Sequence, residues 1–238
     1  MNLDSTTSSR QNLPRDPLRL VRWIVIGHQS PRDAIFGMDM IGFASNHCNL
    51  RHTEEPVTVS DNICWVVDLE ATLEDAPALA QKGLQGLVQQ GIAESIPDSG
   101  GALSGADLYR PGPKAAAWSE YIADDLQLCG VELTAERTVF HTGSNSEQIR
   151  CPHCGSDHEL DTLPWSEAVE RWHSEADCTL MCRTCAHSAP IVDWTFIEFD
   201  WAFGNLGFGF NNWMIDARLA AELGNVLGHR TKVVYEHI

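Results

Sequence analysis

The amino-acid sequence predicts an α+β fold, and three observations point to it. Apolar residues recur at helical spacing in two segments, 75–90 and 216–227. Short apolar runs with partial alternation, typical of strands, lie before and between these segments. Two Cys-x-x-Cys pairs, typical of a small metal-bound unit, interrupt the second half of the chain. We therefore expect an N-terminal mixed α/β region, an inserted or following zinc ribbon, and a C-terminal β-β-α-β unit.

The composition is that of an acidic globular protein. The chain has 238 residues, of which 43% are hydrophobic and 21% charged, and its formal net charge is −17. A general role in binding DNA or RNA needs a basic face, so this charge disfavours nucleic acid as a partner. No apolar run reaches the ~18 residues of a membrane span, and no secretory signal pattern is found at the start. We therefore expect a cytoplasmic protein with no membrane association, whose paired cysteines bind metal.

The elements of the N-terminal region follow from local pattern. Residues 1–16 are polar and predict a disordered arm, whereas the apolar run 18–27 predicts a first strand. A second strand is expected within 57–69. The helix over 75–90 has acidic residues near its start, which the helix dipole favours, and it stops at Gly91.

A β-hairpin is expected to follow this helix, formed by 92–96 and 108–110 around a tip rich in glycine and serine. A helix followed by a hairpin is also typical of a winged helix, but Lys82 is the helix's one cation, which disfavours DNA binding. Farther along, 115–128 predicts another helix and 131–141 another strand.

We place a domain boundary in the turn-rich stretch near residue 145. Residues 17–145 then form an N-terminal α+β domain. Residues 146–238 hold the zinc ribbon and the C-terminal β-β-α-β unit.

The Cys-x-x-Cys pairs carry the strongest chemical signal in the chain. Two residues between cysteines let both sulfurs reach one ion at about 2.3 Å, and two such pairs close a tetrahedron. Four thiolates leave no position for water or substrate, so we expect one structural Zn²⁺ and not a catalytic ion. The expected ligands are Cys151, Cys154, Cys182 and Cys185. A core-facing position is expected for Cys178, and surface positions for His153, His158 and His187.

The alternatives to zinc are bound iron, a redox-active Cys-x-x-Cys, or two unrelated pairs of buried thiols. The order His173-Ser-Glu175 and then Cys182-x-x-Cys185 is superficially similar to the signature of zinc deaminases. However, the proline before the second pair is missing, and this interpretation leaves the first pair unexplained. No Gly-x-Ser-x-Gly elbow, His-Glu-x-x-His helix or Walker A loop is found in the sequence.

Aromatic residues and glycines crowd the segment 194–213. A strand is expected over 194–198, a helix over 216–227 closed by Gly228, and a terminal strand over 230–235. The rings can form a core that joins the ribbon to the last helix, or some of them can be exposed as anchors for a partner. The candidate interaction residues are Trp213, Asn211 and Asn212.

Several of these motifs occur together in one group of proteins. They are the knuckle CPHCG at 151–155, the second Cys-x-x-Cys, the stretch FGNLGFGFNNW at 203–213, LGHR at 227–230, and YRPGP at 109–113. The chain resembles, over about residues 80–238, bacterial proteins that share a CPxCG…CxxC…GFxFxNW…LGHR pattern. This resemblance implies a bacterial cytosolic zinc-ribbon protein and carries no activity with it.

We expect a non-enzymatic zinc-ribbon protein that acts through protein–protein interaction. Its acidity would suit a basic partner, as for an immunity or antitoxin-like partner of a basic toxin, because complementary charge speeds and selects association. An alternative is an enzyme of unknown reaction with a cleft between the two halves of the chain. A second alternative is a nucleic-acid-associated zinc ribbon, which would need a basic face on the folded ribbon.

Overall fold

The computed structural model describes residues 61–123, 126–143, 146–175 and 177–237, which all belong to one compact unit, Arg51–Ile238. The arm expected over 1–16 and the strand expected over 18–27 lie outside the described residues. Within the described residues the fold is α+β, as predicted, with antiparallel strands and three α-helices. None of these helices is long and apolar enough to cross a lipid bilayer.

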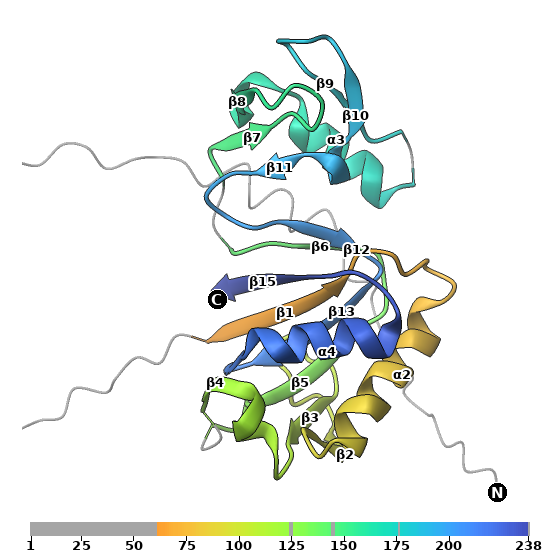
Figure 1. Ribbon diagram of the computed structural model, residues 1–238, viewed down its shortest axis with the longest axis vertical. Helices are drawn as coiled ribbons and strands as arrows, with labels where there is room; N and C mark the ends of the chain where they lie inside the picture. The colour runs from red at the N-terminus through yellow and green to blue at the C-terminus, as the bar shows by residue number, and fades with distance from the viewer. Residues whose placement is uncertain (1–60, 124–125, 144–145, 176, 238) are drawn as a thin grey trace, which may run out of the picture. The chain divides into compact units, whose positions relative to one another are not determined.

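The centre of the fold is a six-stranded antiparallel sheet with the strand order β15-β1-β13-β5-β3-β2 (Figure 1). Its strands are β1 (Asn62–Asp68), β2 (Ala93–Asp98), β3 (Leu108–Pro111), β5 (Gly130–Thr134), β13 (Leu206–Asn211) and β15 (Thr231–His237). The sheet crosses the boundary that we expected near residue 145, because β1 and β5 find their partners in the last third of the chain.

One face of the sheet is covered by α2 (Ala76–Gln89) and α4 (Ala217–Leu227), the two helices that the apolar periodicity predicts (Figure 1). Phe208 and Phe210 of β13 belong to the core under them, and both are fully buried. Helix α4 is capped at its start by Asp216, whose carboxylate accepts a hydrogen bond from the Arg218 backbone. It ends at Gly228, which has the left-handed backbone common at helix ends.

The opposite face of the sheet carries a second, smaller core around Trp65 and Phe140. Two glycines of β13 lie beneath these rings, Gly207 under Phe140 and Gly209 under Trp65. A Cβ on either glycine would come within 2.7 Å of a ring atom. Because side chains alternate along a strand, the sequence Gly-Phe-Gly-Phe sends its phenylalanines to the helices and leaves room for rings on the other side.

The cysteine pairs lie in an insertion between β6 (Thr138–Phe140) and β12 (Ala202–Gly204), which pair with each other. The strands of the insertion are β7 (Gln148–Arg150), β8 (Asp157–Glu159), β9 (Thr179–Met181), β10 (Ser188–Pro190) and β11 (Thr195–Phe196). They form a three-stranded sheet, β11-β7-β8, and a hairpin of β9 and β10. The helix between the cysteine pairs is α3 (Trp165–His173), and short 3-10 turns span Leu160–Thr162 and Ile191–Asp193.

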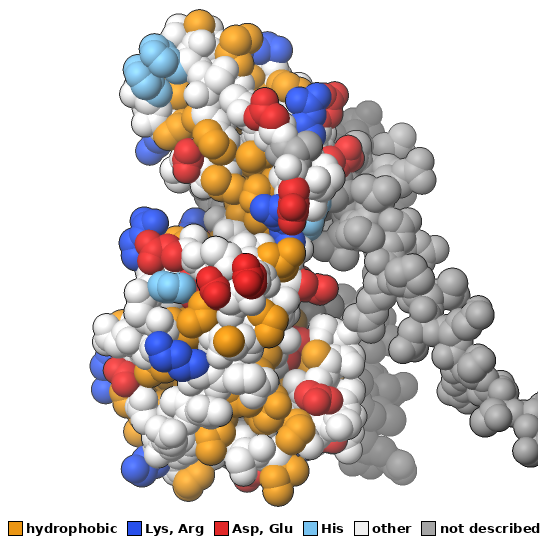
Figure 2. Space-filling view, turned by 90° about the vertical axis from the view of Figure 1, so that its right-hand side faces the viewer, with side chains coloured by type: hydrophobic (Ala, Val, Ile, Leu, Met, Phe, Trp, Pro, Cys, Tyr) orange, Lys and Arg blue, Asp and Glu red, His pale blue; other side chains and the backbone are white. Residues whose placement is uncertain are grey.

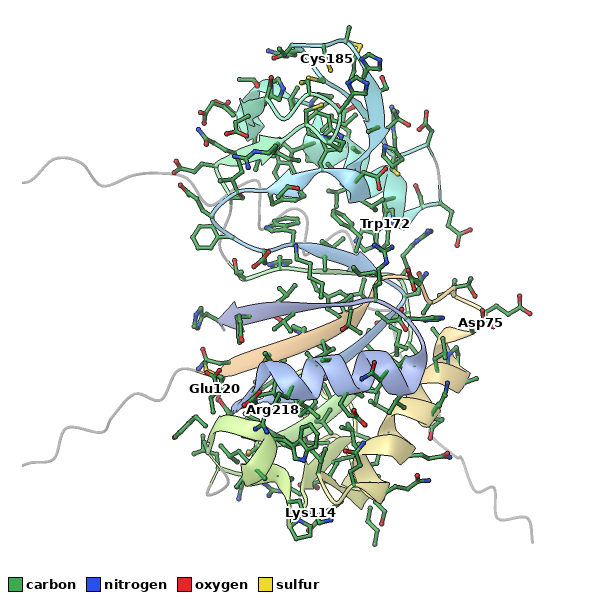
Figure 3. All side chains as sticks on the ribbon, viewed as in Figure 1. Asp75, Lys114, Glu120, Trp172, Cys185 and Arg218 are labelled. Atoms are coloured by element: carbon green, nitrogen blue, oxygen red, sulfur yellow. The ribbon has the colours of Figure 1, made fainter. Side chains whose placement is uncertain are left out.

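Aromatic rings join this insertion to the β6–β12 pair. Trp172 of α3 makes an edge contact with Phe203 of β12, at 5.2 Å between ring centroids (Figure 3). The guanidinium of Arg137 lies 4.7 Å from the centroid of the Trp172 ring. Phe196 and Trp201 stack at 4.6 Å with nearly parallel planes. Most rings of the 194–213 segment are thus core residues, as one of our two interpretations proposed.

The helix predicted over 115–128 is wrong beyond its first turn. A 3-10 turn spans Ala115–Trp118, and the chain then becomes β4 (Ser119–Ile122), which pairs with β14 (Trp213–Ile215). Pairing with a strand distant in sequence outweighs the local preference of the alanine run for helix. The strand expected over 131–141 is interrupted and forms β5 and β6, whereas the expected hairpin is confirmed by the pairing of β2 with β3.

Candidate metal centre

The structure brings the four predicted cysteine ligands together at the ends of two hairpins. Figure 3 labels one of them, Cys185. Their Sγ atoms lie within 4.8 Å of one another. The Cys151–Cys185 sulfur distance is 4.0 Å, and the Cys154–Cys182 distance is 3.7 Å. Four sulfurs at 2.3 Å from a central ion stand about 3.8 Å apart in a regular tetrahedron. The cluster therefore has the spacing that a metal ion needs.

Each cysteine pair sits in a turn of the same kind. In the first, Cys151 donates its N–H to the Ser156 carbonyl at 3.0 Å, and its own carbonyl accepts from Gly155 at 3.0 Å. In the second, Cys182 makes the corresponding bonds with His187 and Ala186, at 2.8 and 2.9 Å.

The residue after each pair has a left-handed backbone, with φ of 71° at Gly155 and 58° at Ala186. The two hairpins, β7–β8 and β9–β10, thus present their sulfurs in matched geometry. The matched turns explain why the Cys-x-x-Cys spacing occurs twice.

Polar groups around the sulfurs are placed to stabilise thiolates. The Nε2 atom of His158, on β8, lies 3.2 Å from the sulfur of Cys182, and the backbone N–H of His153 points to the sulfur of Cys151 at 3.4 Å. Groups that hydrogen-bond metal ligands orient them and tune the metal. His158 is therefore not a plain surface residue, and its sequence signal is its position on the strand that returns from the first turn.

The thiols of the cluster differ in pKa because their neighbours differ. Hydrogen bonding with the Ser156 side chain and backbone lowers the pKa of the Cys154 thiol to about 6. The pKa of Cys185 is raised to about 12, because burial and the three neighbouring thiols outweigh the lowering effect of the His187 backbone. Neighbouring thiolates repel a further negative charge, and a cation at the centre of the cluster would remove that penalty.

The remaining cysteine of this region stands apart. Cys178 is half-buried and is not one of the four clustered thiols, and its carbonyl accepts a hydrogen bond from the Ile191 backbone. Ile149, Leu180 and Ile191 are fully buried apolar residues of the insertion. With Trp172, Trp194 and Phe196, which are also buried, they give the insertion an apolar core of its own.

The candidate interaction residues are wrong as exposed anchors. Trp213 is only 2% exposed and donates its indole N–H to the Ser119 hydroxyl. Asn211 is fully buried against Glu132, and Asn212 donates its side-chain amide to the Leu128 carbonyl. The backbone φ of Asn212 is 49°, which asparagine tolerates better than most residues, so the two asparagines form a bend between β13 and β14.

An apolar hollow nevertheless lies beside them. It encloses about 330 Å³, and Cys64, Phe210 and Trp213 are among its lining residues. Its exposed apolar lining residues are Tyr121 at 65%, Met214 at 43% and Tyr235 at 43%. We call this surface the Tyr121 hollow. Alternation along β14 buries Trp213 and exposes Met214.

Buried carboxylates form two further networks that sequence analysis missed. Asp68 is fully buried and accepts hydrogen bonds from the Ala71 backbone and the His229 ring, the latter at 2.8 Å. Glu132 is also fully buried and is bonded by Asn211 and Ser104. Both carboxylates are thus hydrogen-bonded to groups of the protein itself. The bonds connect loops to the sheet, and neither carboxylate faces an open site.

Comparisons of the chain with protein-family models, with curated proteins and with solved structures find no match. The resemblance to bacterial zinc-ribbon proteins therefore stays a prediction.

Proposed function

We propose that the four clustered cysteines hold one structural Zn²⁺, so that the insertion is a zinc ribbon, and that the protein acts in the cytoplasm by binding a basic protein. An immunity or antitoxin-like partner of a basic toxin is the role that this combination suits best. The observation that carries the proposal is the Tyr121 hollow, an apolar surface on a strongly acidic protein.

The thiol geometry supports a structural ion. With four sulfur ligands at tetrahedral spacing, the ion has no open position at which a substrate could bind. Zinc accepts this geometry without electronic preference and is the common ion of such sites.

Metal analysis of the purified protein tests this part of the proposal. We expect one tightly held zinc per chain at the four-cysteine centre, and Cys151→Ser should remove it and unfold the insertion, seen as lost hydrogen-exchange protection in β7 to β11. Protection in the central sheet should persist. A coloured protein that contains iron, or full zinc retention in Cys151→Ser, would contradict the proposal.

The Tyr121 hollow has the composition of a protein-binding surface. Tyrosine and methionine are enriched in interfaces, and an apolar cavity lets a partner insert one side chain and exclude water around it. Tyr121, Met214 and Tyr235 come from three strands, β4, β14 and β15, so the surface is held by pairing within sheets and not by a loop.

The acidic charge of the chain favours a basic partner. The chain carries 33 acidic and 16 basic residues. Glu236 lines the hollow, and the charge of Glu120 acts on both Cys64 and Tyr235 within it. An apolar hollow with carboxylates beside it favours a partner that offers an apolar side chain flanked by lysine or arginine.

Site-specific crosslinking tests the binding surface. A photoreactive phenylalanine derivative at position 121 should capture a basic protein in the source cells. The same group at Ile96 should not capture it. Ile96 is 78% exposed and lies on β2, the edge strand of the six-stranded sheet farthest from β15. Binding of the captured protein should weaken when salt is raised and when Met214 is changed to Ser. Equal capture from both positions, or capture of acidic proteins alone, would contradict the proposal.

The enzyme alternative has less support among the described residues. An active site needs polar groups that converge on a cavity and remain available to a substrate. The Tyr121 hollow is mainly apolar, and the guanidinium of Arg110, which lines a second hollow, is engaged with the Leu126 carbonyl at 2.9 Å. The nucleic-acid alternative would require a basic face, against which the net charge of −17 counts.

A further inference from the structure

Two histidines meet at the outer side of the cysteine cluster. The rings of His153 and His187 stack, with centroids 3.6 Å apart and planes inclined by 12°. Both residues are exposed, and Figure 2 shows adjoining histidine side chains at the surface of the part that carries the cysteine hairpins. A ring nitrogen of each and the sulfur of Cys185 lie within 4.8 Å of one another.

The two matched turns bring the histidine rings into contact. His153 lies inside the first turn, between its two cysteines, whereas His187 follows the second turn directly after Ala186. The backbone of His187 is fixed by the hydrogen bond that its carbonyl accepts from Cys182. Each hairpin thus contributes one imidazole, and both imidazoles stand beside Cys185, which is less buried than Cys151 and Cys182.

Charge makes this place attractive to a second cation. Four thiolates carry four negative charges, and one divalent ion supplies two positive ones, so the loaded centre keeps an excess of two negative charges. A thiolate has more than one lone pair and can bridge two ions. On its exposed side Cys185 brings this excess charge close to a ring nitrogen of each histidine.

We propose that His153, His187 and the bridging sulfur of Cys185 form a second metal site, which takes a divalent transition-metal ion. Two imidazoles and one thiolate suit Zn²⁺, Ni²⁺ and Cu²⁺, and exclude the hard cations Mg²⁺ and Ca²⁺. Three protein ligands leave a coordination position open, so this ion exchanges, unlike the ion of the four-cysteine centre. The second site rests on the proposed zinc centre, because the thiolate charge of that centre attracts the second ion.

Zinc stoichiometry tests the second site on the full chain. Protein stripped with a chelator and dialysed against Zn²⁺ should hold two ions by native mass spectrometry. The double variant His153→Ala, His187→Ala should hold one ion. The matched control His237→Ala removes an exposed histidine outside the cluster and should keep two. His187→Cys, which replaces one ligand by another, should also keep two ions on its own.

Cadmium NMR assigns each ion to its ligands. After loading with ¹¹³Cd²⁺, one resonance should have the shift of four sulfur ligands and a second that of mixed nitrogen and sulfur ligands, and only the second should vanish in the double variant. A single ion in the wild-type protein would overturn the second site. Loss of both ions in the double variant would also overturn it, by assigning the histidines to the first centre. If the proposed zinc centre itself is wrong, Cys151→Ser will keep the four-sulfur resonance.

Discussion

The indole ring of Trp65 lies directly over the Cα of Gly209, so close that a Cβ on this glycine would stand 2.7 Å from two ring atoms. The two residues face each other across neighbouring strands, β1 and β13. Trp65 is further fixed by the hydrogen bond from its Nε1 to Glu236, at 2.7 Å. The ring therefore cannot move aside without losing a partner.

Gly209→Ala is expected to lower the free energy of unfolding by about 1–3 kcal/mol, because overpacking forces the ring or the strand to shift. Denaturant unfolding measures the loss. In a Trp65→Leu background, where the ring is absent, the same change should cost much less. Equal costs in the two backgrounds would show that the contact is not the cause.

The matched turns of the metal centre predict opposite effects for two reciprocal substitutions. Gly155→Ala introduces a Cβ at φ 71°, with no atom within 4 Å to clash, so it should cost about 1 kcal/mol from backbone strain alone. Ala186→Gly, at φ 58°, should relieve the same strain and stabilise the insertion. Thermal unfolding of zinc-loaded protein measures both. The same sign for the two variants would contradict the backbone explanation.

His158→Ala is expected to weaken metal binding, because its ring supports the sulfur of Cys182. Loss of such an outer partner typically costs about 10–100-fold in metal affinity. Competition with a chromophoric chelator measures the change. His237→Ala is the matched control and should leave the affinity at the wild-type value, whereas unchanged affinity in His158→Ala would show that this contact is incidental.

Glu236 predicts a pH dependence of stability. Burial raises the pKa of its carboxyl above the ordinary value of 4.5, against the lowering effect of the Trp65 hydrogen bond. A group whose pKa is raised on folding contributes stability below its unfolded pKa and loses it as pH rises through the folded value. Relative to Glu236→Gln, the wild-type protein should therefore lose stability as pH increases from about 4.5. Denaturant unfolding at several pH values measures this difference, and a constant difference would refute the prediction.

Sequence patterns predicted the parts of the fold that local chemistry decides. Helices α2 and α4 have clear apolar periodicity and glycine stops, and both form within a residue or two of the expected ends. The four clustered thiols were predicted because two Cys-x-x-Cys pairs have few geometrically sensible uses.

Long-range pairing decided the parts that were missed. The segment 115–128 has the composition of a helix, but Ser119–Ile122 pairs with a strand almost a hundred positions later. The same pairing buries Trp213 and turns Met214 outward, which no local pattern reveals. Hairpin pairing likewise brings His158 to the sulfur of Cys182, and His153 and His187 stack only because the two cysteine turns lie side by side.

The insertion is joined to the rest of the chain at Phe140 and Ala202, which lie opposite each other on β6 and β12. Because its two ends leave the sheet at paired positions, a segment of different length can join the same two strands. For protein engineering, the same two positions form a ready splice point at which a different binding loop could be grafted onto this scaffold.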